Sequence, residues 1–270
     1  MIPTFVNMDI LKAVILGIVQ GLTEFLPVSS SGHLEILNHF MPSDGALDSD
    51  LTMVVITHLG TALSIVYVFR KDIINILKSL VTFNRNEDFE ISMKILLSMI
   101  PALFIGLAFE EQIEALFASN TLIYVGIFLC VTALVLWFTP KIKTEGVITF
   151  PKAFGIGIAQ AIAILPGISR SGMTIATALY LGIDRVKAAR FSFLMLLPVI
   201  FGKVILDVAG GELVVNSGNA IILFAALMSS FIVGIVACKW MLKIVQNAKL
   251  SYFAIYCFIV GASVISTSLF

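Results

Sequence analysis

Charged residues are scarce in this chain of 270 residues: Asp, Glu, Lys and Arg together make up 13% of it. Apolar residues make up 59%, and the mean hydropathy of +1.04 lies far above the range of soluble globular proteins. The apolar runs are long and lack the alternation of barrel strands. Because hydrocarbon offers no hydrogen bonds, every backbone N–H and C=O must be satisfied within the chain. The sequence therefore predicts a single all-α polytopic membrane domain.

Cysteine and histidine are also rare, with three of each. Cys130, Cys238 and Cys257 lie inside apolar runs without CxxC or His-rich spacing, which argues against a disulfide framework or a cysteine metal site. The first residues have neither a basic stretch before the apolar run nor a small-residue cleavage pattern, so we expect no signal peptide. We expect membrane lipids as partners and no nucleic acid.

Six segments are long and apolar enough to cross a bilayer. They cover residues 51–69, 91–108, 121–138, 186–208, 220–242 and 251–269. Two further apolar stretches, 10–40 and 150–181, are interrupted by LPVSSSGH and LPGISRSG, which are too rich in Pro, Ser and Gly to continue a helix. Each of these two stretches is predicted to form two half-helices around a loop.

Lysine and arginine are absent from alternate loops, at 41–50, 110–120 and 210–219. The positive-inside rule places these loops outside and the basic loops in the cytoplasm. The assignment closes only if each broken stretch enters and leaves on one side as a re-entrant hairpin, with Lys12 as one basic exception outside. Because three full spans separate the hairpins, the second half of the chain is predicted to be inverted relative to the first.

An internal repeat supports the inversion. A shift of 140 residues aligns GIVQGLTEFLPVSSSGH, from Gly17, with GIAQAIAILPGISRSGM, from Gly157, without a gap. Matched interruptions in two halves of a membrane protein are typical of a binding site at the repeat interface. We predict two inverted repeats, 1–140 and 141–270, each with a re-entrant hairpin and three spans, within one domain covering 1–270.

The first half-helix carries two polar residues on one face, because Gln20 and Glu24 are four residues apart. A glutamate inside a membrane is costly, which makes Glu24 a functional candidate. A protonated glutamate satisfied by a neighbouring helix is the structural alternative.

The loop that follows concentrates hydroxyl groups at the start of the second half-helix. Ser29, Ser30 and Ser31 precede Gly32 and His33. A helix N-terminus concentrates unpaired N–H donors and positive dipole, so this segment suits an anion. Helix capping is the alternative, but capping would use one serine rather than three.

Arg170 is the one arginine predicted to lie in the membrane interior, at the corresponding loop of the second hairpin. Its planar guanidinium, with five donors, suits phosphate oxygens. The alternative is that Arg170 pairs only with Glu24, which would equally bring the two loops together. His58, within the first full span, is predicted either to line the cavity or to pack, and Lys203 to snorkel toward an interface.

The segments QGLTEFLPVSSSGH and LPGISRSGMT together resemble the two signature motifs of the undecaprenyl-diphosphate phosphatase family of membrane-embedded enzymes. The resemblance covers nearly the whole chain, and the family's six spans, two re-entrant hairpins and inverted repeat agree with the features above. At the first acidic-motif position the family permits Glu or Gln, and this chain has Gln20.

The resemblance implies removal of the terminal phosphate of undecaprenyl diphosphate, which recycles the lipid carrier of cell-wall (peptidoglycan) synthesis and confers bacitracin resistance. It implies a multi-pass protein of the plasma (inner) membrane with an extracytoplasmic active site. It further implies a divalent cation, Mg²⁺ or Ca²⁺, for which Glu24 is the candidate metal ligand, and a homodimer.

In the resulting hypothesis Ser30 is the nucleophile and Glu24 is its base or metal partner, while His33 positions or protonates the reacting groups. A nucleophilic His33 or a water activated by Glu24 stays open. The predicted catalytic residues are Glu24, Ser30, His33 and Arg170, and the predicted substrate-binding residues are Gln20, Ser29, Ser31, Gly32, Ser169, Ser171, Gly172 and Thr174. The competing class is a secondary transporter or a flippase of a polyprenyl phosphate lipid, because broken helices in an inverted repeat are equally typical of transporters.

Overall fold

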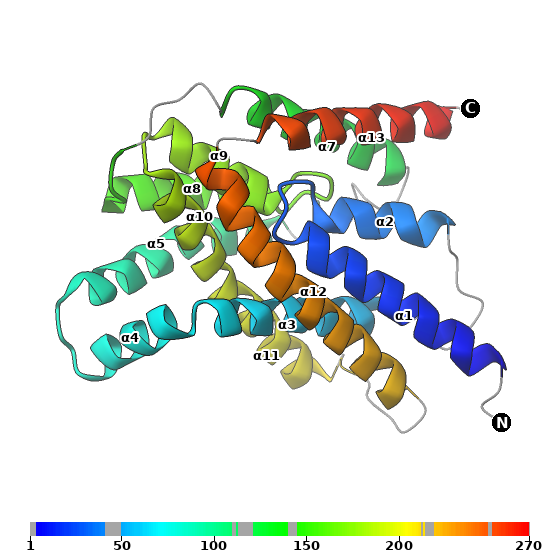
Figure 1. The fold of residues 1–270 in the computed structure, drawn as a ribbon, viewed down its shortest axis with the longest axis horizontal. Coiled ribbons are helices and arrows are strands. Elements are labelled where there is room, and N and C mark those ends of the chain that lie inside the picture. Colours follow the sequence, from blue (N-terminus) through cyan, green and yellow to red (C-terminus); the bar gives the residue numbers. More distant parts are fainter. Residues whose placement is uncertain are drawn as a thin grey trace.

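The computed structural model describes residues 4–40, 50–109, 112, 121–139, 145–211, 213, 219–247 and 250–269. Over these residues the fold is helical, and the extended pairing is limited to an isolated bridge between Gly146 and Ile183 (Figure 1). Most of the predicted outer loops lies outside the described residues. In chain order the helices are α1 (Thr4–Thr23), α2 (Ser30–Phe40), α3 (Asp50–Val68), α4 (Arg70–Val81), α5 (Glu87–Ala108), α7 (Thr121–Trp137), α8 (Phe150–Ile162), α9 (Arg170–Tyr180), α10 (Arg185–Leu194), α11 (Leu196–Gly210), α12 (Ala220–Gln246) and α13 (Ser251–Leu269).

Four helical stretches among the described residues are long and apolar enough to cross a membrane: Glu87–Ala108, Arg185–Gly210, Ala220–Gln246 and Ser251–Ser268. A fifth candidate is α3 followed by α4, but the chain bends by 85° between them. The apolar part of α7 is shorter than these spans. Over the part of the chain that the structure describes, the protein is therefore an all-helical, multi-pass membrane protein with four or five candidate spans, and the predicted count of six is not confirmed.

Both predicted interruptions break a helix at the expected place. The first break separates α1 from α2, and the second separates α8 from α9. Proline lacks an N–H donor and disfavours a helical conformation in the residue before it, so Pro27 helps to end the first half-helix. Ser29 then has φ 70°, and Gly167 in the second loop has φ 97°. The second hairpin keeps its predicted bounds closely, whereas α1 begins at Thr4, before the predicted start at residue 10.

The first helix of each hairpin packs against a helix from the other half of the chain. α1 lies along α12, and α8 lies along α5 (Figure 1). Glycine permits both approaches, since a Cβ added to Gly17 would collide with Ser229 and one added to Gly157 would collide with the backbone of Ser98. Small residues at helix contacts are typical of membrane proteins. Gly17 and Gly157 are also related by the shift of 140 residues.

A buried aromatic contact fixes the end of the first half-helix. Phe25 is fully buried, and its ring meets the ring of Phe193 on α10 edge to face, with centroids 5.3 Å apart. Such pairs contribute about 0.5–1.5 kcal/mol beyond their area burial. The contact holds the neighbouring Glu24 at a defined place beside the second hairpin.

Candidate active site

A cavity of about 340 Å³ lies where the two hairpin loops meet α3 and α11. Most of its wall is aliphatic, with side chains from α3, from α11 and from the second loop. The polar and charged side chains in the wall are Glu24, Ser30 and Ser31 of the first hairpin, Arg170 of the second, His58 of α3 and Lys203 of α11. Charged and hydroxyl groups from four separate segments therefore share one largely apolar chamber.

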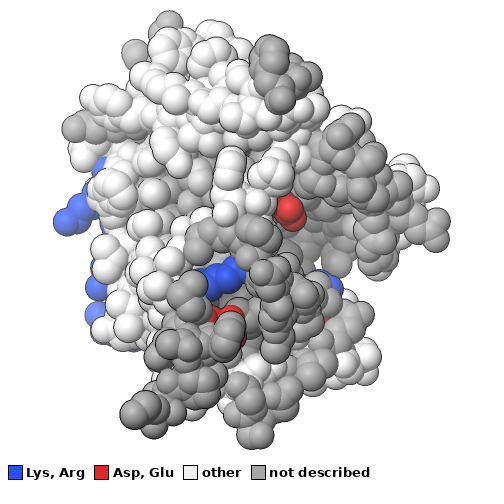
Figure 2. Space-filling view, turned by 90° about the vertical axis from the view of Figure 1, so that its right-hand side faces the viewer, with Lys and Arg blue, Asp and Glu red and all other residues white. Residues whose placement is uncertain are grey.

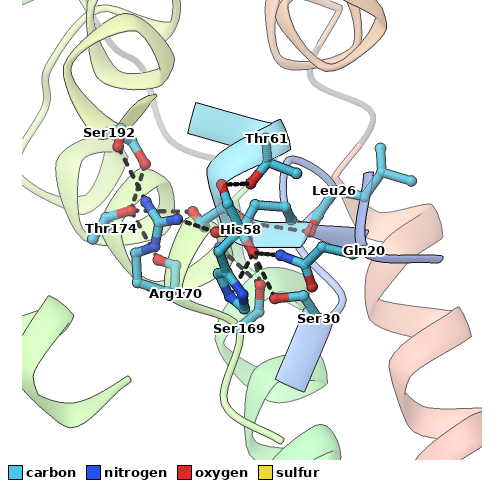
Figure 3. A network of polar contacts seen from close by, with 12 residues as sticks. Gln20, Leu26, Ser30, His58, Thr61, Ser169, Arg170, Thr174 and Ser192 are labelled. Carbon is cyan, nitrogen blue, oxygen red and sulfur yellow. Dashed lines mark hydrogen bonds and ion pairs between the residues drawn. The ribbon is translucent and has the colours of Figure 1, made fainter. Parts of the chain in front are cut away.

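Glu24 bonds to three residues of the polar network, Gln20, Ser30 and Arg170, which are labelled in Figure 3. Its Oε1 accepts a hydrogen bond from Nη2 of Arg170 at 2.5 Å, and the two residues form an ion pair. Its Oε2 accepts from the hydroxyl of Ser30 at 2.7 Å and from the amide of Gln20 at 2.8 Å. The side chains of Glu24 and Arg170 are only 5% and 16% exposed. Because a buried charge is tolerated only when it is paired and hydrogen-bonded, the pair fixes the two hairpins to each other.

Ser29 and Ser169 occupy equivalent places in the two loops and cap the two following helices in the same way. The hydroxyl of Ser29 accepts from the N–H of Gly32 at 3.3 Å, and that of Ser169 accepts from the N–H of Gly172 at 3.1 Å. Ser29 also accepts from the N–H of Gly167 at 3.1 Å, which joins the first loop to the second.

Other hydroxyl groups join the loops to each other and to α7. Ser171 donates to the carbonyl of Leu26 at 3.1 Å. Thr132, on α7, accepts from the N–H of Ser169 at 3.0 Å and donates to the carbonyl of Gly167 at 3.2 Å. The role of Thr132 was not predictable from the sequence, because a single threonine in an apolar span carries no distinguishing signal.

Thr174 lies behind Arg170 rather than in the cavity wall. Its hydroxyl is 2.6 Å from that of Ser192 and donates to the carbonyl of Arg170 at 2.9 Å. Of the eight predicted substrate-binding residues, Ser31 lines the cavity and Gln20 contacts Glu24. Five of the other six lie in the loops or at the starts of the helices that follow them, and Thr174 bonds to Arg170 and Ser192. The role of all eight in substrate binding stays a prediction.

His33 is turned away from the cavity. Its Nδ1 lies 2.8 Å from the carbonyl oxygen of Ser29, and its Nε2 lies 2.7 Å from the hydroxyl of Tyr256 on α13. The two rings stack with centroids 5.6 Å apart. Since a carbonyl only accepts, Nδ1 donates to Ser29, and in the neutral ring Nε2 then accepts from Tyr256. The geometry supports a role for His33 in positioning the loop, and its predicted role in proton transfer stays a prediction.

His58 is the histidine that faces the cavity. Its Nδ1 donates to the carbonyl of Val54 at 2.8 Å, and its Nε2 lies 3.7 Å from Oε2 of Glu24. Of the two alternatives left open by the sequence, the structure supports lining of the cavity. A histidine within an apolar span was the available signal, but it did not distinguish a packing histidine from a functional one.

The side-chain oxygens of Glu24 and Gln20 fit a divalent cation that is held mainly by a substrate. Within the described part of the chain no group of three or more His, Cys, Asp and Glu residues is placed to hold a metal ion. Oε1 of Gln20, however, is buried beside Glu24 without a hydrogen-bond partner. Mg²⁺ is commonly bound by one or two carboxylates together with substrate phosphates. Glu24 and Gln20 are accordingly the residues that would hold such an ion.

Comparison with known proteins identifies relatives over almost the full length. The family model for "Bacitracin resistance protein BacA" matches residues 13–263. The chain is 51% identical over 259 residues to a protein of Christiangramia forsetii named undecaprenyl-diphosphatase, with 96% of this chain and 98% of that protein covered. Proteins with the same name from Bacteroides thetaiotaomicron and Korarchaeum cryptofilum are 44% and 38% identical, over 97% and 96% of this chain and 100% and 99% of theirs. The chain therefore belongs to the bacitracin resistance protein BacA family.

Proposed function

We propose that this protein hydrolyses undecaprenyl diphosphate to undecaprenyl phosphate and inorganic phosphate, and so recycles the lipid carrier of peptidoglycan synthesis. One observation carries the proposal: Ser30 and Arg170, from different hairpins, meet on the carboxylate of Glu24 inside one cavity. A hydroxyl bonded to a carboxylate, beside a guanidinium, suits phosphoryl transfer. The aliphatic wall suits a substrate that is a lipid, and the relatives carry the name undecaprenyl-diphosphatase.

The reaction begins with attack of the Ser30 hydroxyl oxygen on the terminal phosphorus. The hydroxyl proton passes to Oε2 of Glu24 along the existing hydrogen bond of 2.7 Å. The bond between this phosphorus and the bridging oxygen breaks, and the lipid leaves as a monophosphate that keeps the bridging oxygen. Arg170 offsets the negative charge on the transferring group. Water then hydrolyses the phosphoserine, releases inorganic phosphate and restores the Ser30 hydroxyl.

A divalent cation, when bound by Glu24 and Gln20, would neutralise phosphate oxygens. The geometry favours Ser30 over His33 as the nucleophile, because Ser30 lines the cavity and the ring of His33 is bonded to Ser29 and Tyr256. A water activated by Glu24 is the remaining alternative.

Within the plasma membrane, the chain is proposed to form six spans and two re-entrant hairpins, in inverted repeats 1–140 and 141–270. The cross-packing of α1 on α12 and of α8 on α5 supports this arrangement, as does the matched capping by Ser29 and Ser169. The face in Figure 2, at the end where α2 and the N-terminal part of α1 lie, displays few charged side chains among its described atoms. This scarcity supports an extracytoplasmic orientation of that face, toward which the cavity is proposed to open. A homodimer stays a prediction from the resemblance.

The test is release of phosphate from undecaprenyl diphosphate by purified protein in detergent, with Mg²⁺, with Ca²⁺ and with a chelator. We expect cation-dependent release that is lost in Ser30→Ala and in Arg170→Ala. The control Ser266→Ala, whose hydroxyl bonds only within α13, should retain activity. A phosphorylated intermediate trapped by rapid quenching should map to Ser30, and its mapping to another residue would contradict the serine mechanism. Folded protein that releases no phosphate would favour a transporter or flippase, which lipid transfer between vesicle leaflets would test.

A further inference from the structure

Lys203 shares the cavity wall with Arg170, and its place on α11 shows that it faces the same chamber. Leu196, Val199, Ile200, Lys203 and Val204 line the cavity. They are spaced at i, i+3, i+4, i+7 and i+8, which is one face of a helix. Lys203 is therefore a single cation in an otherwise aliphatic stripe that is directed at the contents of the cavity.

The partner of Lys203 distinguishes it from a lysine that only reaches for water. A snorkelling lysine extends along apolar surface to place its ammonium in solvent. The ammonium of Lys203 instead donates to Oδ1 of Asp207 at 2.6 Å, one helical turn further along α11. The carboxylate of Asp207 is only 3% exposed, whereas the side chain of Lys203 is 58% exposed. A buried acid thus holds a lysine whose side chain is largely exposed, and the ammonium keeps donors beyond the one given to Asp207.

A lipid diphosphate carries two phosphate groups, and Arg170 is the cationic side chain that the two hairpins place in the described cavity wall. Arg170 is paired at 2.5 Å with Glu24, so much of its charge is already compensated before a substrate binds. The terminal phosphate must lie at Ser30 and Arg170 for transfer to occur. The other phosphate remains on the lipid, and among the described residues of α11 that line the cavity the charged one is Lys203.

We propose that Lys203, held in place by Asp207, binds the phosphate that stays on the lipid, while Arg170 binds the terminal phosphate. Lys203 is then a specificity residue for phosphorylated lipids, and Asp207 is a positioning residue. The inference rests on the proposed phosphatase function, and it predicts that Lys203 contributes to the affinity for the product as well as for the substrate.

The test uses a neutral pair, because Lys203→Met alone would leave the buried carboxylate of Asp207 without its partner. The double variant Lys203→Met/Asp207→Asn removes both charges at nearly constant volume. Lys203→Arg keeps the charge, and Lys152→Met, which removes a lysine outside the cavity, controls for overall charge. The measured quantities are KM for undecaprenyl diphosphate and the inhibition constants of undecaprenyl phosphate and of inorganic phosphate.

In the double variant we expect KM and the inhibition constant of undecaprenyl phosphate to rise by about tenfold or more, as for loss of a charged hydrogen bond. The inhibition constant of inorganic phosphate should stay unchanged, since it reports the terminal-phosphate site. Lys203→Arg and Lys152→Met should stay within about threefold of the wild type. A purely structural role would lower thermal stability without separating the two inhibitors.

The inference is overturned if the affinity for undecaprenyl phosphate does not change, or if both inhibitors weaken in parallel. Failure of the proposed function has a different signature, because the wild type would then release no phosphate. In that case direct binding of undecaprenyl phosphate, compared with undecaprenol, still tests Lys203. Loss of the preference for the phosphorylated lipid in the double variant would support the role of Lys203, and an unchanged preference would refute it.

Discussion

Replacing Arg170 by Met removes the guanidinium that joins the second hairpin to the first. Arg170 makes an ion pair with Glu24 at 2.5 Å and a long hydrogen bond, of 3.5 Å, to the carbonyl of Ser192. After the substitution Glu24 keeps two donors, the amide of Gln20 and the hydroxyl of Ser30. Its negative charge, however, then lies in a nearly buried place without its guanidinium partner, and His58, 3.7 Å away, is the nearest group that can carry a positive charge.

The expected cost follows from this burial. Removing one partner of a buried ion pair destabilises a protein by about 3–5 kcal/mol, because an uncompensated charge is left behind. With two donors still on Glu24, we expect Arg170→Met to lie near the lower end, at about 3 kcal/mol. The double variant Glu24→Gln/Arg170→Met leaves no lone charge and should recover about 2 kcal/mol of that cost. All variants that lack Arg170 should lose phosphatase activity by about two orders of magnitude or more, because the charge on the transferring group is no longer offset.

Equilibrium unfolding in mixed micelles with increasing SDS measures these differences. Cys238 and Cys257 are fully buried, so their reaction with a maleimide dye reports unfolding. The background should carry Cys130→Ser, because Cys130 is partly exposed. The reasoning is refuted if Arg170→Met costs less than about 1 kcal/mol, or if the double variant costs the sum of the two single variants.

Three further predictions concern the second loop, the loop histidine and the cation. Gly167→Ala should destabilise the protein by about 1–3 kcal/mol, since Gly167 has φ 97° and a Cβ there would lie 2.6 Å from the carbonyl oxygen of Val125. The matched control is Gly202→Ala, in a helix with open space around it. This control should be neutral or slightly stabilising in the same unfolding assay. Tyr256→Phe removes the hydroxyl that binds Nε2 of His33. The variant should lower kcat about fivefold, as for a lost hydrogen bond of about 1 kcal/mol. An unchanged kcat would show that this orientation of His33 does not matter for the reaction. Removal of divalent cations should abolish phosphate release, and adding them back should restore it. Full activity in excess chelator would refute the cation prediction.

Much of the architecture was predictable because it depends on local composition. The long apolar runs predicted helices in a membrane, and Pro27, Ser29 and Gly167 lie where the helices are interrupted. The spacing of Gln20 and Glu24 placed them on one face, and their side chains are bonded. The family membership was predictable because the chain contains two specific motifs, and the comparisons with known proteins confirm it. The number of spans was less predictable, since hydropathy does not report the 85° bend after α3.

The amino-acid pattern is enough to establish the helical membrane class, the two breaks and the types of group near them, because these follow from hydropathy and residue chemistry over short stretches. Which of these groups face one another depends on how the helices pack. In the packed structure His58 lies beside Glu24, His33 contacts Tyr256, and Lys203 lies in the cavity wall. The direction of a side chain depends on how its helix is rotated against neighbours that are distant in the chain, and a local pattern contains no record of that rotation.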